Sequence, residues 1–576
     1  MPSTRVLYIS GSVGLGHARR DLAIARELRR LDSGVEIVWL AGEPARQVIA
    51  GAGETLLPES AAYGDETGVA EDAAGGFSLN LMGRFALRAQ SAWKRAVATF
   101  EEVSGKYPYD LLIGDETYEI DVALAKRPEL KKAPFVMIYD FVGLDAMSRN
   151  PLEQLITYRG NWVWGGGPRA KPPTQQDLAL FIGQPEDVAD RPFGFLLPNR
   201  REYARRYYHF VGYTFPFDPA DYSDKKKVRA ALGYDEERPL VICAVGGTAI
   251  GDDLLRLCAA SYPHIQERAS DARMVLVCGP RIDPASIQVP SGVEVRGYVP
   301  RLYEHFAACD VAVVQAGGTT TLELTALRRP FVYFPLEGHF EQNLVVAKRL
   351  ARHGAGERML YSKTTPERLA EVVVGQLGRE ASWPDIPTDG AWRAAELIHK
   401  LAQGQDLREA TQPTFPSKRP GRVLRVFVKY PTRIYRGRLA NVLAARRELL
   451  LTTTGRKSGL PRTTPLNFIT MDGAYVVAAG WGTHADWYQN LLANPEVTVQ
   501  VGKRRFAARA HLVEEPEAQR DLVSQLVRRS WQLSKPPRPV RWFLRTVFSY
   551  DHDAVQTRAI EHPELVPVIR LVPKEG

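Results

Sequence analysis

Short apolar runs alternate with helical patterns along the first two thirds of the chain. One series of runs lies at residues 6–10, 35–41, 109–115 and 133–140, and a second at 239–247, 272–279, 293–299, 310–318 and 330–335. Short buried strands separated by helices are typical of parallel sheets that carry helices on both faces. The pattern therefore predicts an α/β fold class with two Rossmann-like domains, over residues 1–225 and 226–403.

The pattern changes after residue 403. Residues 404–422 combine Pro, Gln, Thr and charged side chains without apolar periodicity, which predicts a linker. Beyond it, strand-like runs follow one another with tight turns between them, at residues 447–454, 462–470, 473–481, 496–501 and 504–513. This spacing predicts a smaller, mostly antiparallel β-barrel over residues 423–576.

Composition narrows the class of protein. The chain is 45% hydrophobic and 24% charged, which is ordinary for a globular protein. No run of about 18 apolar residues predicts a transmembrane helix, and the first residues lack the pattern of a signal peptide. The four cysteines, Cys243, Cys258, Cys278 and Cys309, are widely spaced, which argues against a zinc site and a disulfide framework. We therefore expect a cytoplasmic protein without a metal.

Positive charge is concentrated at the C-terminal end. Residues 418–576 hold 27 Lys and Arg against 13 Asp and Glu, whereas the whole chain has a net charge of +9. Within this part, residues 418–438 alternate basic with apolar and aromatic side chains. They could contact an anionic membrane at its inner face or form a basic helix packed on the barrel, and the second interpretation is favoured. Nucleic acid is disfavoured as a partner, because no binding motif accompanies the charge.

Candidate site residues of the first domain stand where its predicted strands end, since ligands of open α/β sheets bind there. Gly14, Gly16 and His17 belong to the loop GSVGLGH, and Asp115 and Glu116 follow YDLLIG. A glycine loop before a helix can cradle a phosphate, but it can equally be a tight turn. Glu43, near the end of the second run, keeps a dinucleotide site open as an alternative.

The second domain contains a denser polar pattern. AGGTTTLELTALRRP places two glycines and three threonines at a predicted helix start, and PLEGHFEQN follows the next strand. Backbone N–H groups at such a start could hold a diphosphate, Glu323 could accept hydrogen bonds from ribose hydroxyls, and Gln342 and Asn343 could bind sugar hydroxyls. The alternative is a threonine-capped helix followed by a polar surface loop.

These motifs resemble a known family. Residues 5–375 are similar to GT-B glycosyltransferases, in particular to the family of the bacterial peptidoglycan UDP-N-acetylglucosamine transferase and plant monogalactosyldiacylglycerol synthase. The resemblance rests on GSVGLGHARR, AVGGTAIG, GYVPRLYEHFAACDVAVVQAGGTTTLEL and PLEGHFEQN. It implies that the second domain binds a nucleotide-sugar donor and the first an acceptor. The donor residues so implied, with the glycines of the first loop, are Gly14, Gly16, Gly246, Gly247, Thr248, Tyr298, Gly317, Gly318, Thr319, Thr320, Glu323, Gln342 and Asn343.

The family resemblance implies an inverting displacement that needs a base and no metal. His17 is the first candidate base, because neutral imidazole titrates near the working pH. Asp115 and Glu116 are the rival candidates, and His17 could instead cap the turn or contact phosphate. Residues 145–215 do not align with the family.

The barrel region begins with a turn, GRKSG, at residues 455–459. Its cations and hydroxyl suit a phosphate, although a charged hairpin turn is the simpler interpretation. GRKSG, the R-x-T-P-L motif at 462–466 and the D-W-Y-x-N-L-x-A-N-P motif at 486–495 resemble the deazaflavin-dependent nitroreductase family of split-barrel proteins. The resemblance implies the deazaflavin coenzyme F(420), held by Arg456, Lys457, Ser458, Arg462, Pro465, Leu466, Ala479, Gly480, Trp481, Trp487 and Asn490. Tyr550 is a weaker candidate as a proton donor.

Together the two resemblances predict a bifunctional enzyme. One part would transfer a sugar from a nucleotide sugar, expected to be a UDP-sugar, to a lipid-like or small-molecule acceptor. The other would transfer a hydride from the reduced deazaflavin to a quinone or another conjugated small molecule. Two alternatives stay open: one half could be a non-catalytic binding module, or the barrel could be a reductase that uses FMN or a nicotinamide.

Overall fold

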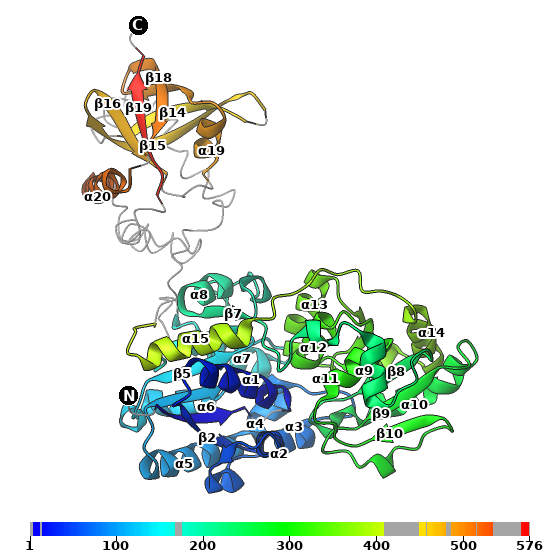
Figure 1. The fold of residues 1–576 in the computed structure, drawn as a ribbon. Helices are drawn as coiled ribbons and strands as arrows, with labels where there is room; N and C mark the ends of the chain where they lie inside the picture. Colours follow the sequence, from blue (N-terminus) through cyan, green and yellow to red (C-terminus); the bar gives the residue numbers. More distant parts are fainter. Residues whose placement is uncertain are drawn as a thin grey trace. The chain divides into compact units, whose positions relative to one another are not determined.

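The computed structural model describes residues 4–11, 14–167, 175–407, 448–456, 458–479, 485–513, 515–533 and 566–574. The chain divides into two compact units, residues 1–411 and residues 412–576. Figure 1 shows the helices and strands of each unit. The first unit contains two parallel sheets and the second contains a closed barrel.

A seven-stranded parallel sheet forms the N-terminal half of the first unit, in the order β3-β2-β1-β4-β5-β6-β7. Its strands are β1 Arg5–Ser10, β2 Glu36–Ala41, β3 Thr55–Leu56, β4 Leu111–Asp115, β5 Phe135–Tyr139, β6 Leu178–Ile182 and β7 His209–Gly212. Along β1, Val6 and Tyr8 pack into the core on one face and Leu7 and Ile9 into the core on the other. Burial on both faces is why these runs are apolar throughout.

Helices connect these strands and cover both faces of the sheet. They are α1 Gly16–Leu31, α2 Ala45–Gly51, α3 Glu66–Ala73, α4 Ala86–Arg88, α5 Gln90–Lys106, α6 Tyr118–Lys126, α7 Pro151–Trp164 and α8 Arg200–Tyr207. In α1 the buried side chains Ala18, Ile24, Ala25 and Leu28 recur with helical spacing. Arg29 and Arg30 in its last turn complement the helix dipole.

The second sheet is also parallel and has the order β10-β9-β8-β11-β12-β13. Its strands are β8 Leu240–Ala244, β9 Arg273–Val277, β10 Val293–Arg296, β11 Val311–Gln315, β12 Phe331–Phe334 and β13 Glu357–Arg358. The accompanying helices are α9 Lys225–Leu232, α10 Asp252–Gln266, α11 Leu302–Ala308, α12 Gly318–Ala326, η9 Glu341–Val346, α13 Ala347–His353 and α14 Pro366–Gln376, and α15 Gly390–Ala402 follows them in the chain. Each sheet reverses its strand order once, between β1 and β4 and between β8 and β11, and ligands bind at such points.

Two segments exchange between the cores of the first unit. Ala70 and Ala73 of α3, with Phe77 and Leu79 after it, pack into the core of the second sheet. In return, Ala391, Ala394 and Ile398 of α15 pack beside β1 and α1 in the core of the first sheet. The cores therefore do not follow one continuous boundary in the sequence, and the borders at 225, 403 and 422 stay predictions.

The second unit contains a closed antiparallel barrel with the order β14-β15-β16-β19-β18-β17. Its strands are β14 Glu448–Thr454, β15 Pro461–Met471, β16 Ala474–Ala478, β17 Glu496–Val501, β18 Arg504–Leu512 and β19 Val568–Pro573. Helix α19 Asp486–Ala493 packs on the core through Trp487, Tyr488 and Leu491, and α20 Pro516–Leu533 packs beside β15 and β16. The predicted fold class, two α/β domains followed by an antiparallel barrel, is confirmed. Among the described residues, no helix is long and apolar enough to cross a membrane.

Candidate functional site

A cavity of about 1490 Å³ lies where the strand orders of the two parallel sheets reverse. Loops after β1, β4, β8 and β11 meet there. The predicted residues that line it are Gly14, Gly16, His17, Glu116, Gly246, Gly247, Thr248, Gly317, Gly318, Thr319, Thr320 and Gln342. The topology thus collects residues that are up to 328 positions apart, from Gly14 to Gln342, around one space.

The glycines of the first loop allow the two halves to approach each other. A Cβ atom added to Gly16 would lie 2.5 Å from Oγ1 of Thr319, and one added to Gly247 would lie 2.9 Å from Cα of Gly14. Gly14 itself has φ +82°, a left-handed backbone conformation that favours glycine. The loop therefore needs glycine at these positions for packing, whatever ligand it contacts.

Two helices begin at the cavity without a side-chain cap. Helix α1 follows Leu15 and α12 follows Gly317, and neither has a side-chain hydrogen bond at its N-cap or an acidic residue in its first turn. The first N–H groups of a helix have no partner inside the helix, and the dipole makes this end positive. Both helix starts can therefore donate to an anion such as a diphosphate.

Several buried polar atoms beside the second sheet lack hydrogen-bond partners. They are Oγ1 of Thr248, Oε1 of Gln315 and both carboxylate oxygens of Glu323. Glu323 is fully buried, and its one ion-pair contact is a long one, 3.7 Å from Oε1 to Nη1 of Arg19. Burial raises the pKa of this carboxyl, and Arg19 opposes the rise. Buried polar groups are normally satisfied, so these atoms indicate a polar ligand.

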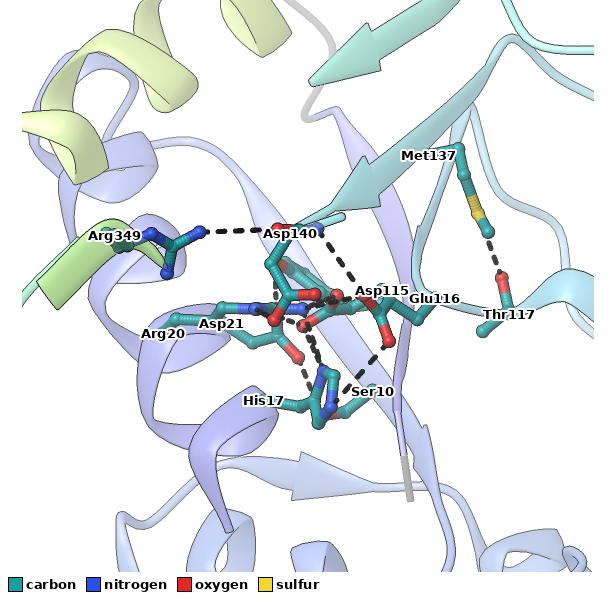
Figure 2. A network of polar contacts seen from close by, with 11 residues as sticks. Ser10, His17, Arg20, Asp21, Asp115, Glu116, Thr117, Met137, Asp140 and Arg349 are labelled. Carbon is teal, nitrogen blue, oxygen red and sulfur yellow. Dashed lines mark hydrogen bonds and ion pairs between the residues drawn. The ribbon is translucent and has the colours of Figure 1, made fainter. Parts of the chain in front are cut away.

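The first sheet supplies a cluster of charged residues at the cavity, shown in Figure 2. Arg20 donates to both oxygens of Asp115, from Nε at 2.7 Å and from Nη2 at 2.5 Å. Its Nη1 donates to Oδ2 of Asp140 at 2.7 Å. Arg20 and Asp115 are buried, so this bidentate pair is a charge-assisted contact shielded from water.

The carboxyl groups of this cluster differ in pKa. Burial alone would raise the pKa of Asp115, but Arg20 and His17 outweigh it and hold the pKa at about 2. The pKa of Asp140 is lowered in the same way, chiefly by Arg20. The Glu116 pKa is raised well above its usual range, first by burial and then by the neighbouring Asp140 charge. Groups with opposed shifts in one cavity are typical of a reaction site.

His17 lies between these groups, and its tautomer decides what it can do. Its Nδ1 is 3.2 Å from Oδ2 of Asp115 and 2.8 Å from Nη2 of Arg20, and its Nε2 is 4.0 Å from Oε2 of Glu116. If Nδ1 donates to Asp115, Nε2 is free to accept a proton. If Nδ1 accepts from the guanidinium, which can only donate, Nε2 carries the proton instead.

Two glutamates, Glu116 and Glu341, also line the cavity. Glu116 follows β4 with φ 52°, a left-handed conformation that is costly for a side chain of this size and that clusters at functional sites. Glu341 begins η9 and lines the cavity from the other half. Burial, reinforced by Asp140, raises its pKa to about 7.

In the barrel, the predicted cofactor residues form a smaller, local cluster. The backbone N–H of Arg456 and its Nη1 both donate to Oδ1 of Asn490, each at 3.2 Å. Nδ2 of Asn490 donates to Oγ1 of Thr453, so the buried amide links the turn after β14 to α19. Trp487 and Ala479 are buried in the barrel core. Pro465 and Leu466 of β15 pair with Leu450 and Leu449 of β14.

Comparisons with known proteins support both predicted families, one for the glycosyltransferase part and one for the barrel. Residues 241–379 match the model of the glycosyltransferase family 28 C-terminal domain, and residues 424–533 match that of F(420)H(2)-dependent quinone reductase. An uncharacterized glycosyltransferase from Methanosarcina acetivorans is 23% identical over 378 residues, which cover 64% of this chain and 88% of that protein. The F(420)H(2)-dependent quinone reductase of Mycobacterium tuberculosis is 44% identical over 69 residues, 12% of this chain and 46% of that protein.

A third relative is a UDP-N-acetylglucosamine–N-acetylmuramyl-(pentapeptide) pyrophosphoryl-undecaprenol N-acetylglucosamine transferase from Methylibium petroleiphilum. It is 29% identical over 147 residues, 23% of this chain and 38% of that protein. The chain thus spans less than half the length of the last two relatives.

The chain joins a glycosyltransferase domain to a domain that matches the model of F(420)H(2)-dependent quinone reductase. Both expected families, and the transferase and oxidoreductase classes they imply, are confirmed. The expected coenzyme, F(420), is confirmed for the C-terminal part, because residues 424–533 match the model of F(420)H(2)-dependent quinone reductase. The described residues contain no group of three or more His, Cys, Asp or Glu side chains that could hold a metal.

Some predicted residues do not line the glycosyltransferase cavity themselves. Asp115 does not line it, because Arg20 and His17 cover it. Tyr298, Glu323 and Asn343 are also absent from its lining. The Asn343 amide is used structurally, since Nδ2 donates to the carbonyl groups of Leu336 and His339 and Oδ1 accepts from Arg358. Glu43, the residue of the dinucleotide alternative, pairs with Arg46 and does not line the cavity.

Other predicted residues fall outside the described part of the chain. These are Lys457, Gly480, Trp481, Tyr550, the basic stretch 418–438 and most of the predicted linker. Arg456, Ser458 and Arg462 are described, and Ser458 N–H closes the turn by donating to the Gly455 carbonyl.

The sequence predictions missed three charged residues of the site, Arg19, Arg20 and Glu341. Arg19 and Arg20 closely follow His17 in GSVGLGHARR, and Glu341 stands in PLEGHFEQN. Both motifs contain other residues of the predicted site. The residues next to Arg20 in the sequence, however, do not show that its side chain binds the carboxylates of Asp115 and Asp140. A charged residue one helical turn after a glycine loop is the signal that could have found it.

Proposed function

We propose that the first unit transfers a sugar from a nucleotide sugar, most simply a UDP-sugar, with inversion. The observation that carries the proposal is the start of α12, where free backbone donors and the unpartnered atoms of Thr248 and Gln315 line one cavity. The unpartnered carboxylate of Glu323 is buried on the same helix, behind this lining. Donors suit the diphosphate, and acceptor oxygens suit ribose hydroxyls. The name of the Methylibium relative, a UDP-N-acetylglucosamine transferase, supports the same donor class.

In this proposal His17 is the base, in the tautomer whose Nδ1 donates to Asp115. The acceptor oxygen attacks the anomeric carbon while its proton passes to Nε2 of His17. The bond from that carbon to the diphosphate oxygen breaks, and the nucleoside diphosphate leaves with the added negative charge. The dipole and N–H groups of α12 stabilise this charge without a metal. One displacement of this kind inverts the anomeric centre.

Asp115 fits a supporting role better than that of base. Both of its oxygens accept from Arg20, and its low pKa leaves it little affinity for a proton. Glu116 faces the cavity and remains the rival base. In this scheme Gln342 and Glu341 face the sugar, while Gly14 and Gly16 let the chain pass near the diphosphate.

The acceptor is proposed to be lipid-like or an apolar small molecule. The cavity extends from His17 into an apolar chamber lined by Met82, Tyr118, Phe141, Ile156 and Trp164 of the first half and by Phe340 of the second. These side chains pack against one another as a separate cluster, with aromatic rings about 5 to 6 Å apart. The hydroxyl of Tyr118 is buried without a hydrogen-bond partner, so it is available to a polar group of the acceptor.

Calorimetric titration with UDP tests the donor assignment. We expect Glu323→Ala to weaken UDP binding about tenfold or more, because two hydrogen bonds to a carboxylate are lost. Glu367→Ala, on α14 of the same half, is the matched control and should bind UDP as the unaltered chain does. If UDP does not bind the unaltered chain, the donor assignment is wrong; if UDP binds but no UDP-sugar is turned over, this half is a binding module.

For the second unit we propose hydride transfer to a quinone or another conjugated small molecule. The described residues fit a phosphorylated, acidic group: Arg456 and Arg462 are cationic, Ser458 carries a hydroxyl, and Pro465, Leu466 and Ala479 offer an apolar wall. Bound reduced F(420) would supply the hydride. The protein would fix the acidic tail at the turn, and Asn490 would hold Arg456 in place through its two hydrogen bonds.

Binding of F(420) tests this assignment. We expect Lys457→Ala to weaken F(420) binding at least several-fold, because a cation is lost from the turn. Lys503→Ala, an exposed lysine between β17 and β18, is the matched control. Unchanged affinity in Lys457→Ala overturns the phosphate assignment, and uptake of FMN in place of F(420) overturns the coenzyme.

A further inference from the structure

Helix α7 has an exposed face that is almost wholly apolar. Leu152, Leu155, Trp162 and Val163 are exposed, and their spacing places them on one side of the helix. Phe195, which is 80% exposed, and Leu196 extend the same surface. The link is Tyr158, whose hydroxyl donates to the Phe195 carbonyl and whose ring lies 6.2 Å from that of Trp162. We call this surface, residues 152, 155, 158, 162, 163, 195 and 196, the α7 patch.

Within the part of the chain that the structure describes, the α7 patch is left exposed. Single exposed apolar residues are common, but a contiguous group that includes Trp and Phe marks a contact surface. The buried residues of α7, Glu153, Thr157 and Asn161, face the opposite way and hold the helix to the domain. Asn161, for example, donates to the carbonyl groups of Leu144 and Phe193.

Two exposed arginines accompany the α7 helix. The acidic residue of α7, Glu153, is buried and accepts hydrogen bonds from Asn80 and from the backbone N–H of Met147. Arg159 lies among the patch residues, and the exposed Arg149 precedes the helix. Apolar side chains with Trp and Tyr, flanked by arginine and free of exposed carboxylates on the helix, suit a lipid headgroup boundary.

The same helix also borders the acceptor chamber. Ile156, Gly160 and Trp164 line the cavity, and so do Arg159 and Val163 on the exposed side of the helix. Val163 is both strongly exposed and part of the cavity wall. The cavity wall and the α7 patch therefore share one helix and meet at Val163.

We propose that the α7 patch docks on the surface of a lipid bilayer and that the acceptor enters the cavity from the bilayer. The use of that acceptor rests on the proposed glycosyl transfer, but the docking does not. Continuity with the cavity favours a bilayer over a protein partner, because a partner bound there would block the chamber.

Co-sedimentation with vesicles of phosphatidylcholine and phosphatidylglycerol tests the docking in the full-length chain. We expect Trp162→Glu to lower vesicle binding about tenfold, because an apolar anchor is replaced by a charge that the headgroups repel. Trp392→Glu is the matched control. Trp392 on α15 is 46% exposed, against 44% for Trp162, and α15 packs on the opposite face of the sheet from Tyr158 and Trp164. Trp392→Glu should bind vesicles as the unaltered chain does.

Each other outcome overturns the proposal. Equal binding by the two variants means that another part of the chain makes the contact. A dimer in sedimentation velocity that Trp162→Glu abolishes, without vesicle binding, means that the α7 patch joins two copies. UDP titration of the same variants separates this inference from the proposed function. If vesicles bind but UDP does not, the proposed glycosyl transfer is wrong and the docking proposal stands. Trp162 does not line the cavity, so UDP affinity should be equal in both variants.

Discussion

The two halves of the glycosyltransferase cavity present opposite kinds of chemistry. The first half brings ionised side chains to the ends of its strands, where Arg20 is bound to Asp115 and Asp140 beside His17 (Figure 2). These groups pair with one another, and only Oδ1 of Asp140 among their carboxylate oxygens lacks a hydrogen-bond partner. The second half presents neutral donors at the start of α12 and polar atoms without partners, such as those of Thr248 and Gln315.

The difference indicates a division of labour. A cluster whose charges pair with one another is suited to fix the protonation and orientation of His17. Polar atoms without partners are instead suited to bind a ligand. The first half should therefore govern the rate of the chemical step and the second half the affinity for the donor. Substitutions that separate kcat from donor binding test this assignment.

The largest expected effect is on turnover. His17→Gln should lower kcat about 100- to 10,000-fold, because the proton of the acceptor hydroxyl loses its acceptor. UDP affinity should stay within about threefold, since binding belongs to the other half. Steady-state kinetics with a UDP-sugar and calorimetry with UDP measure the two quantities, and His264→Gln on α10 serves as the control.

A loss of UDP affinity that matches the loss of kcat would contradict the division between the halves. The tautomer can be measured directly, since ¹⁵N shifts of histidine distinguish a protonated Nδ1 from a protonated Nε2. If neutral His17 carries its proton on Nε2, the contact with Arg20 dominates over that with Asp115, and Glu116 becomes the base.

The contact between the halves gives the second prediction. Gly16→Ala should lower the free energy of unfolding of the first unit by about 1–3 kcal/mol, because the new Cβ would lie 2.5 Å from Oγ1 of Thr319. Thr319→Ala removes that oxygen, so the double variant should recover most of the loss. Chemical denaturation measures both. Gly51→Ala, where nothing lies within 4 Å of the added Cβ, is the control.

No recovery in the double variant would mean that Gly16 is required for another reason, such as the close approach of a phosphate. The experiment therefore separates the two interpretations of GSVGLGH that the sequence leaves open.

Much of this site could be predicted from the sequence because strand ends are visible as sequence features. An apolar run that stops at a glycine or a carboxylate locates Gly14, Glu116 and Gly317 at one edge of a sheet. The sequence does not show which side chains then turn toward one another. Arg20 and Glu341 look like ordinary charged helix residues, and Asn343 looks like a ligand residue although its amide holds backbone carbonyl groups.

The packing of helices into the core of the other half is the second feature that the sequence does not predict. Nothing in the pattern of α3 or α15 shows that each packs into the core of the other half, because an amphipathic helix specifies a buried face and not its partner. In the barrel, by contrast, Arg456 and Asn490 are joined through a turn and a neighbouring helix. Residues of such a local motif are close in the sequence, so the sequence already indicates that they lie together. This is why the sequence predicts the barrel residues as one group.

The smallest expected effect concerns Glu341 and pH. Burial first, then Asp140, raises its pKa in the folded chain to about 7, above the unfolded value of about 4.3. For a raised carboxyl pKa, the stabilising contribution is present below the unfolded pKa and is lost as pH rises through the folded pKa. The free energy of unfolding should therefore fall between about pH 5 and about pH 8 by about 1 kcal/mol on account of this half-buried group.

Glu341→Gln should remove that fall, since an amide does not ionise, and denaturant titrations at both pH values measure it. Glu380→Gln, an exposed glutamate of the same half, should keep the pH dependence of the unaltered chain. If Glu341→Gln keeps it too, Glu341 is ionised throughout, and the second half then presents a negative charge to the donor. The second half would then not be neutral at its cavity wall. Arg20 and Arg349, whose charges act on Glu341 and lower its pKa, would have to balance the extra negative charge.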